Sequence, residues 1–233
     1  MLYRYETHLH TFPVSRCAKA DVEAALTFYK NLGYDGVFIT NHFLDGNINI
    51  DPSLPYEEKL SFFFSDYETA KELSPSIGIK VFLGVESSYK GTDFLIYGLS
   101  KEWYFAHPEI MGMEKNELFR MMRADGAFVA QAHPFREPSY LKHIRLFPRA
   151  VEAVEVINSS DGDGNVLSNK MAGIYAKEYD LIPFAGSDNH AASAAPLLAG
   201  MQGECPIENE ADFAEKVRAG SLVPFCMKNP LCP

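Results

Sequence analysis

Short apolar runs alternate with longer amphipathic stretches along this sequence, and that alternation restricts the folds it can adopt. The runs that predict β-strands are LYRYETH from Leu2, GVFIT from Gly36, KVFLGVE from Lys80, DFLIYGL from Asp93, AFVAQA from Ala127, AVEVIN from Ala153, LIPFAGS from Leu181 and SLVPF from Ser221. Amphipathic periodicity predicts helices over residues 20–33, 56–73, 114–126, 168–180 and 208–220. Strands that alternate with helices favour a parallel α/β sheet, either closed as a (β/α) barrel or open as a doubly wound fold.

One stretch departs from this alternation. No helix fits between the strand from Lys80 and the strand from Asp93, so residues 86–99 are expected to form a hairpin. With 233 residues and 47% hydrophobic content, the chain can bury a substantial core. No linker, low-complexity tract or internal repeat divides the sequence, and we therefore expect one domain over residues 1–233.

The charge and the cysteine usage narrow the classes of function. A formal net charge of −10 at pH 7 argues against a general nucleic-acid or membrane-surface partner, because such partners attract a basic face. The N-terminal residues MLYRYETHLH lack the apolar core of a signal peptide, and no window is a transmembrane span, which predicts a cytoplasmic protein. No Cys-x-x-Cys pair occurs among Cys17, Cys205, Cys226 and Cys232, which favours reduced thiols over a disulfide framework.

Polar side chains follow the ends of the predicted strands, where the active site of a parallel barrel collects. The first strand ends in His8 and His10, which alternation along a strand places on one face. Later strands lead to Asn41 and His42, to Glu86, to His133, to Asn158, and to Asp188 and His190. This mixture of imidazoles and carboxylates suits zinc, iron or manganese better than calcium or magnesium. Because no single segment supplies enough donors, several strands must converge on the metal.

Each of these residues has a simpler interpretation when it is taken alone. Glu86 can be a solvated strand end, His42 a half-buried histidine with satisfied partners, and Asp188 the N-cap of a following helix. Their shared position at strand ends favours the metal site instead. His107 and His143 do not follow a predicted strand in this way, and we expect both to be structural or surface residues.

The ordered set of motifs resembles the polymerase and histidinol phosphatase (PHP) superfamily. The motifs are His-x-His-Thr, Thr-x-His, Gly-x-Glu, Ala-His-Pro and Gly-Ser-Asp-x-His, and they run in the family's order between residues 6 and 190. The resemblance implies a distorted (β/α)7 TIM-like barrel over residues 1–233, with the site at the C-terminal ends of the strands. It also implies two or three divalent transition metals (zinc, manganese or iron) and phosphoesterase activity.

The resemblance also assigns metal ligands to positions of this chain. One metal position is matched by His8, His10, the bridging Glu86 and Asp188. A second position shares Glu86 and is matched by His133, and ligands of a third are matched by His42 and His190.

Two family ligands are missing from this chain. An acid or histidine usually follows the His-x-His motif, where Ser15 and Arg16 stand here, and a histidine usually occupies the position of Phe94. Asp93, Cys17 or His107 are candidates to fill the gaps, as are water and substrate oxygens, and Cys17 is notable because a thiolate is a strong zinc ligand. Asn41 stands where the family often has aspartate, so a carboxylate that orients a neighbouring ligand is expected to be absent.

A site of this kind predicts hydrolysis by metal-activated water. No Gly-x-Ser-x-Gly or Cys-His nucleophile motif stands out, which agrees with water as the attacking group. Arg136, three residues after His133, is the first candidate to bind the substrate phosphate and Arg16 the second; the alternative for each is a solvated surface charge. The general acid is left open among metal-bound water, Asp188 and a histidine.

The sequence thus predicts a metal-dependent phosphomonoesterase, similar to histidinol phosphatases, that acts on a small phosphorylated substrate; it makes no prediction of oligomeric state. One alternative is an amidohydrolase-type hydrolase, which also begins with His-x-His but often uses a carbamylated lysine. Here the corresponding strand ends at Glu86, and Lys90 lies beyond it. The second alternative is a catalytically weakened metal-binding or regulatory barrel, which the missing ligands at Ser15 and Phe94 motivate.

Overall fold

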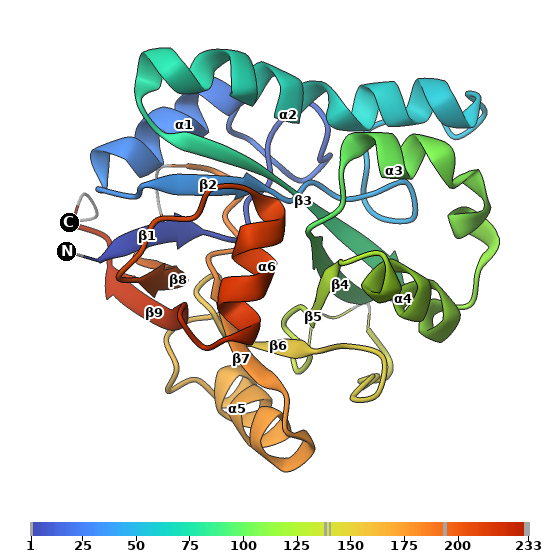
Figure 1. Ribbon diagram of the computed structural model, residues 1–233. Helices are drawn as coiled ribbons and strands as arrows, with labels where there is room; N and C mark the ends of the chain where they lie inside the picture. The colour runs from blue at the N-terminus through green and yellow to red at the C-terminus, as the bar shows by residue number, and fades with distance from the viewer. Residues whose placement is uncertain (1, 138, 140, 193–194, 231–233) are drawn as a thin grey trace.

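A curved sheet forms a nearly closed barrel at the centre of the structure (Figure 1). The structure is a computed structural model, and it describes residues 2–137, 139, 141–192 and 195–230. Cys232 lies outside these residues. In the described part the sheet has nine strands in the order β7-β6-β5-β4-β3-β2-β1-β8-β9. They are β1 Tyr3–Glu6, β2 Gly36–Ile39, β3 Lys80–Tyr89, β4 Thr92–Tyr97, β5 Phe128–Gln131, β6 Ala153–Asn158, β7 Ile182–Gly186, β8 Leu197–Gly203 and β9 Val223–Lys228. The predicted TIM-like α/β barrel is therefore confirmed.

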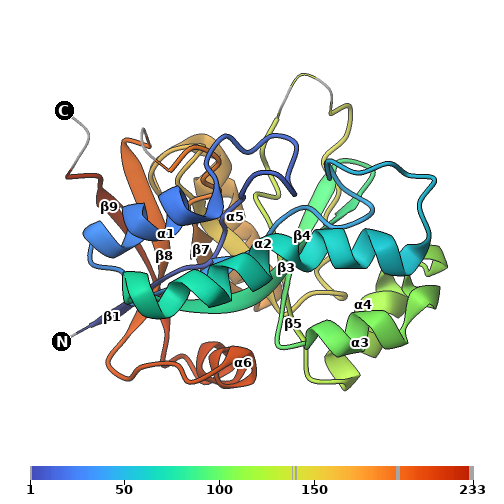
Figure 2. The same ribbon diagram turned by 90° about the horizontal axis from the view of Figure 1, so that it is seen from above.

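Helices cover the outside of this sheet. They are α1 Val22–Asn31, α2 Tyr56–Ile77, α3 Lys101–Ala106, α4 Lys115–Ala124, α5 Leu167–Tyr179 and α6 Glu210–Arg218, with a 3-10 turn at Pro108–Gly112. The five predicted helices are all present, whereas α3 was not predicted. Figures 1 and 2 show α1 and α2 side by side, and α5 packed beside β6 and β7. Within the described residues, no helix has both the length and the apolar composition needed to cross a lipid bilayer.

The predicted hairpin is present as β3 and β4. Strand β4 runs antiparallel to both of its neighbours, β3 and β5, whereas β1–β2–β3 and β5–β6–β7 are parallel. Lys90 and Gly91 form its two-residue turn with φ values of 52° and 81°. Two positive φ values suit the turn that joins tightly twisted strands, and glycine supplies the second without a steric penalty.

The structure has one strand more than the eight that the sequence predicted, because β8 was missed, and both counts exceed the seven of the (β/α)7 pattern. Strand β8 pairs antiparallel with both β1 and β9, in a segment LLAGMQG that has no alternation of apolar and polar residues. Gly200 of β8 has a structural reason, because a Cβ at this position would lie 2.1 Å from the carbonyl oxygen of Tyr5 on β1. The close approach of β8 to β1 therefore requires glycine.

Backbone pairing continues beyond the ends of several strands and aligns the segments that follow them. Leu9 forms a parallel bridge with Asn189, in which the His10 amide donates to the Asn189 carbonyl (3.0 Å). His42 and Glu86 form a second parallel bridge, and the Glu86 amide donates to the Asn41 carbonyl (3.1 Å). Polar residues that follow β1, β2 and β7 are thereby held beside β3.

An aromatic core fills the opposite end of the barrel. Phe213 of α6 packs against aromatic rings from three strands. Its ring centroid lies 4.4 Å from that of Phe38, 5.2 Å from that of Tyr97 and 6.2 Å from that of Phe184. Figure 2 shows α6 on the side of the barrel away from the loops that follow β1 and β2. Because one end is filled with apolar side chains, the polar strand ends are confined to the other.

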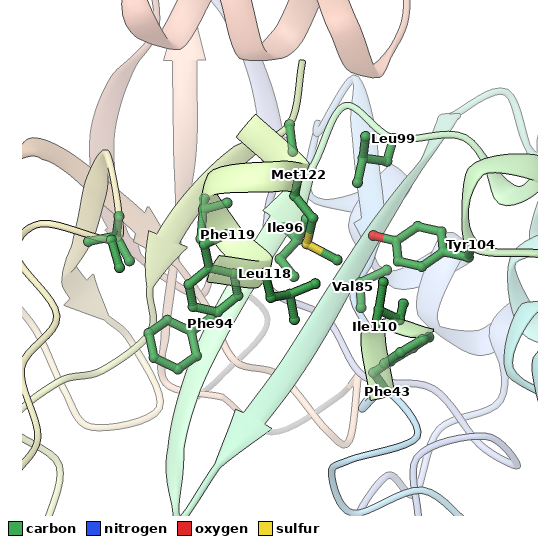
Figure 3. Close-up of a cluster of buried hydrophobic side chains, with 14 of the residues drawn as sticks. Phe43, Val85, Phe94, Ile96, Leu99, Tyr104, Ile110, Leu118, Phe119 and Met122 are labelled. Carbon is green, nitrogen blue, oxygen red and sulfur yellow. The ribbon is translucent and has the colours of Figure 1, made fainter. Parts of the chain in front are cut away.

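A second core lies outside the barrel, between β4 and the helices α3 and α4 (Figure 3). Phe94 packs here, with its ring centroid 4.6 Å from that of Phe119 and 5.1 Å from that of Phe147. Because successive side chains of a strand face opposite sides, Asp93 and Leu95 face the barrel interior. Phe63 and Phe64 of the SFFFSDY segment are also buried in this core, as the helix prediction implied.

The replacement of Gly200 by alanine tests the close contact between β8 and β1. We expect Gly200→Ala to lower the free energy of unfolding by about 2–4 kcal/mol, because the new Cβ forces the strands apart. Gly173→Ala is the matched control: a Cβ at Gly173 of α5 meets no atom within 4 Å, and alanine favours helix by up to about 1 kcal/mol. Urea unfolding followed by circular dichroism measures the stability of both variants. Equal stability of the two variants would show that the contact between β8 and β1 does not require glycine at position 200.

Candidate metal centre

All seven residues predicted as metal ligands converge at one end of the barrel. Their ligand atoms form three overlapping groups, each with members within 4.8 Å of one another. The groups are His8, His10 and Asp188; His8, Glu86 and His133; and His10, His42 and His190. Two of these residues have positive φ values, His133 at 25° and Asp188 at 52°, a conformation that is concentrated at functional sites.

Glu86 lies at the centre of these groups and faces four imidazoles. Its Oε1 is 3.1 Å from His8 Nε2 and 3.5 Å from His133 Nε2. Its Oε2 is 2.6 Å from His42 Nδ1 and 3.4 Å from His10 Nε2. Burial alone would raise the pKa of Glu86, but the charges of His42 and His8 hold it well below its usual value. The carboxylate is therefore ionised and placed to bridge ligand groups.

Glu155 orients His8, and the sequence analysis did not identify it. Its Oε1 lies 3.0 Å from His8 Nδ1, and its Oε2 accepts hydrogen bonds from the His133 amide (3.0 Å) and from Asn158 Nδ2 (2.9 Å). Because a carboxylate accepts, Nδ1 of His8 donates to Glu155, which turns Nε2 towards Glu86 Oε1, a second carboxylate oxygen at 3.1 Å. A buried carboxylate on the remote nitrogen is the usual partner of a metal-binding histidine. Its signal in the sequence is an acid inside the otherwise apolar strand AVEVIN.

A chain of polar side chains orients His10 in the same way. His10 Nδ1 lies 3.2 Å from Ser15 Oγ, whose hydroxyl donates to Asn41 Oδ1 (2.8 Å). Asn41 Nδ2 in turn donates to Asp66 Oδ2 (3.0 Å), which fixes the direction of the whole chain. His10 Nδ1 therefore donates to Ser15 and leaves the lone pair of Nε2 directed at the ligand groups. Burial, with the charges of His190 and His42, lowers the pKa of His10 to about 3, so this ring is neutral.

These contacts give roles to two residues that depart from the PHP pattern and correct the expectation for one of them. Ser15 adds no ligand to the three groups, but its buried hydroxyl positions the His10 ring. Asn41 does not deprive the site of an orienting carboxylate, because Asp66 on α2 supplies one through it. Sequence alone could not identify Asp66, since it lies on a predicted helix with no motif around it.

Of the three protein residues considered as replacement ligands, two lie at the centre and one does not. Asp93 lines the central cavity and accepts a hydrogen bond from Ser88 Oγ (2.5 Å), while its neighbour Phe94 faces away from the site. Cys17 also lines this cavity. His107 instead ends α3 and stacks on Trp103 with ring centroids 4.2 Å apart, which agrees with its expected structural role.

The central cavity has a volume of about 520 Å³. Arg136 is the one arginine or lysine among the described residues that line it, and its Nη1 donates to Asp188 Oδ2 (2.8 Å). Arg16, the second candidate for phosphate binding, is exposed on a loop outside this lining. His143 is also exposed and borders a small neighbouring cavity, as expected for a surface residue.

The donor set fits divalent transition metals. His10 Nε2, His42 Nδ1 and Glu86 Oε2 are buried and lack a hydrogen-bond partner among the described residues. The 2.6 Å approach of His42 Nδ1 to Glu86 Oε2 is thus a contact between two potential ligand atoms without hydrogen-bond geometry. Buried polar atoms of this kind are destabilising unless a cation or proton lies between them. Imidazole and carboxylate donors suit zinc, manganese or iron.

Comparisons with known proteins agree with this geometry. Residues 166–222, which contain α5, β7, β8 and α6, match the family model PHP_C, described as PHP-associated. The fold resembles that of a two-domain protein from Bacteroides vulgatus containing a predicted PHP-like metal-dependent phosphoesterase, with a TM-score of 0.65, 13% identity and coverage of 97% of this chain and 65% of that one. The partial family match and the similar fold both agree with the predicted resemblance to the PHP superfamily.

Two further solved structures have a similar fold. A lesion-specific endonuclease from Pyrococcus furiosus has a TM-score of 0.58 at 12% identity, with 94% of this chain and 56% of the endonuclease covered. An amidohydrolase from Chromobacterium violaceum has a TM-score of 0.50 at 13% identity, with coverage of 94% and 97%. This chain therefore spans less than two thirds of the length of the Bacteroides protein and of the endonuclease. No curated protein sequence matches it significantly.

Glu155→Gln tests the orienting role of this carboxylate. We expect the affinity for Zn²⁺ or Mn²⁺ to fall by about 10–100-fold, because His8 loses the acceptor that fixes its ring. Glu152→Gln is the matched control, since Glu152 precedes β6 and pairs with Arg218 (2.8 Å) away from the centre. Competition with a chromogenic chelator measures the affinity, and circular dichroism checks that both variants fold. Equal affinity in the two variants would show that Glu155 does not orient a ligand.

The pH dependence of metal uptake follows from His133. Burial lowers the pKa of His133, but a hydrogen bond with Glu86 and the charge of Asp188 outweigh it and raise the pKa to about 9. A metal binds only the neutral ring, so the proton competes below this value and the apparent affinity for Mn²⁺ should rise as the pH increases towards about 9. Calorimetry in buffers of different ionisation enthalpy should detect proton release on binding at neutral pH. Uptake without proton release would contradict this expectation.

Proposed function

We propose that this chain is a metal-dependent phosphomonoesterase that acts on a small phosphorylated substrate. The observation that carries the proposal is the convergence of three overlapping ligand groups on a cavity whose lining, in the described part of the chain, contains one arginine and no lysine, Arg136 being that arginine. Divalent ions held by these groups would lower the pKa of a water molecule and offset negative charge on a phosphoryl group.

The protein's own side chains have complementary tasks in this reaction. Arg136 is positioned at the rim by Asp188 and by Asp161, whose Oδ1 lies 3.5 Å from Arg136 Nε. Its planar guanidinium can bind two phosphate oxygens at once, which fixes the orientation of the substrate. Burial alone would raise the pKa of Asp188, but the charges of His8 and other histidines hold it well below its usual value. Asp188 is therefore ionised and does not suit the proton donor to the leaving group.

A neighbouring cavity supports an apolar leaving group on the substrate. This cavity has a volume of about 620 Å³ and shares Arg136 with the central cavity. Its other lining residues include four apolar side chains: Phe135, Ile144, Leu167 and Met171. A phosphate bound by Arg136 would thus present the rest of the substrate to an apolar surface, where burial of hydrocarbon is favourable.

The two alternative functions have less support. A carbamylated lysine would need a lysine in the central cavity, but none occurs among the described lining residues, and Lys90 lies exposed at the hairpin turn. A weakened metal-binding or regulatory barrel that keeps one metal would need one group of oriented ligands, whereas three overlapping groups converge here. The phosphoesterase proposal accounts for both observations.

Metal analysis and hydrolysis of p-nitrophenyl phosphate, on protein purified without a histidine tag, test the proposal together. We expect two or more transition metals per chain and a hydrolysis rate that chelation abolishes and added manganese, zinc or iron restores. Hydrolysis of p-nitroacetanilide but not of the phosphate ester would instead favour the amidohydrolase alternative. One metal or none, with no hydrolysis after metal addition, would overturn the phosphoesterase proposal in favour of the regulatory barrel.

Arg136→Gln tests the phosphate-binding role. We expect kcat/KM for p-nitrophenyl phosphate to fall by about 10–100-fold, the usual range for losing charge-assisted hydrogen bonds. Arg149→Gln, which replaces an exposed arginine before β6, is the matched control and should change neither rate nor metal content. Elemental analysis of Arg136→Gln separates lost phosphate binding from lost metal. Unchanged kinetics at full metal content would show that Arg136 does not bind the substrate phosphate.

A further inference from the structure

We propose that the thiolate of Cys17 is a ligand of the metal position formed by His10, His42 and His190. The proposal rests on the metal centre described above and assigns it a sulfur donor, which the resemblance to the PHP pattern does not provide. Cys17 lies seven residues after His10, close to the position where the pattern has an acid or a histidine. The thiol lines the central cavity together with His42 and His190.

Backbone hydrogen bonds hold Cys17 beside this group. On one side the Arg16 amide donates to the Asn47 carbonyl (3.0 Å), and on the other the Lys19 amide donates to the His190 carbonyl (2.7 Å). The second bond ties the loop of Cys17 directly to the loop of His190. These bonds thus hold the cysteine at the wall of the cavity that His42 and His190 also line.

The three imidazoles independently point to a shared cation. His10 is 1% exposed, and its Nε2 lacks a hydrogen-bond partner among the described residues. Its ring centroid is only 4.4 Å from that of His42 and 4.3 Å from that of His190. His190 Nδ1 donates to the Asp188 carbonyl (2.9 Å), so its Nε2 also carries a lone pair. Converging lone pairs repel one another unless they share an ion.

The chemistry of the four side chains suits zinc. Three imidazoles leave one position of a tetrahedral site open, and a thiolate is among the strongest zinc ligands. A soft sulfur donor also favours zinc over manganese or magnesium, so this position should differ in preference from those around Glu86. The other described cysteines lie elsewhere, Cys205 exposed and Cys226 on β9. Cys17 is the one described cysteine that lines the cavity.

Cobalt substitution of the full chain tests this assignment with a spectroscopic readout. Co²⁺ bound to the wild type should give a near-ultraviolet thiolate-to-cobalt charge-transfer band, because sulfur donates charge to the ion. Cys17→Ser should lose the band, and Cys226→Ser, the matched control, should keep it. Cys17→Asp should restore tight metal binding without the band, which separates loss of the ligand from loss of the fold. A band that persists in Cys17→Ser, or cobalt binding to the wild type without a band, would overturn the proposal.

Alkylation distinguishes a ligand from a free nucleophile beside two histidines. Zn²⁺ should slow the reaction of Cys17 with iodoacetamide while leaving exposed Cys205 unaffected, as measured by peptide mass spectrometry. Equal alkylation of Cys17 with and without zinc would contradict ligation. Hydrolysis of p-nitrophenyl phosphate is measured on the same samples. A cobalt-thiolate band without hydrolysis would support Cys17 as a ligand and contradict the proposed phosphoesterase activity. Hydrolysis without the band would support the activity and contradict Cys17 as a ligand.

Discussion

The rest of the site depends on the interaction of the buried Glu86 carboxylate with the four imidazoles around it. A carboxylate at 1% exposure is strongly destabilising unless positive charge surrounds it. The strand ends must therefore deliver histidines to it from several directions at once. The parallel bridges of Leu9 with Asn189 and of His42 with Glu86 do this, because they align segments distant in sequence within hydrogen-bonding distance.

The barrel makes this arrangement stable by separating its two ends. Phe213 and the aromatic rings around it bury apolar surface at the α6 end, which contributes stability that the polar end cannot supply. The polar end is left with side chains whose pKa values are displaced in opposite directions, such as His10 lowered to about 3 and His133 raised to about 9. Such divergence between like groups is typical of functional sites.

The sequence predicted those features that local pattern determines. Strand ends carry the ligands because the C-terminal edges of parallel strands meet, and this rule located all seven residues of the candidate centre. Features set by contacts between distant segments could not be predicted. Strand β8 depends on a close approach to Tyr5, and Asp66 acts through Asn41 from a helix. The metal ligand that is missing at Phe94 has another explanation. Strand β4 runs antiparallel, and its alternation directs Asp93 rather than Phe94 to the cavity.

The departures from the PHP pattern share a physical logic that argues against a vestigial site. Ser15 and Asn41 extend a hydrogen-bonded chain to Asp66, and Asp93 and Cys17 face the cavity beside positions where ligands are missing. A barrel with no use for metal would be more stable with apolar side chains here, because each buried polar atom without a partner is destabilising by about 1–3 kcal/mol. The chain instead retains oriented imidazoles whose lone pairs converge. Under the proposed function, the changed residues provide different donors around the three overlapping ligand groups.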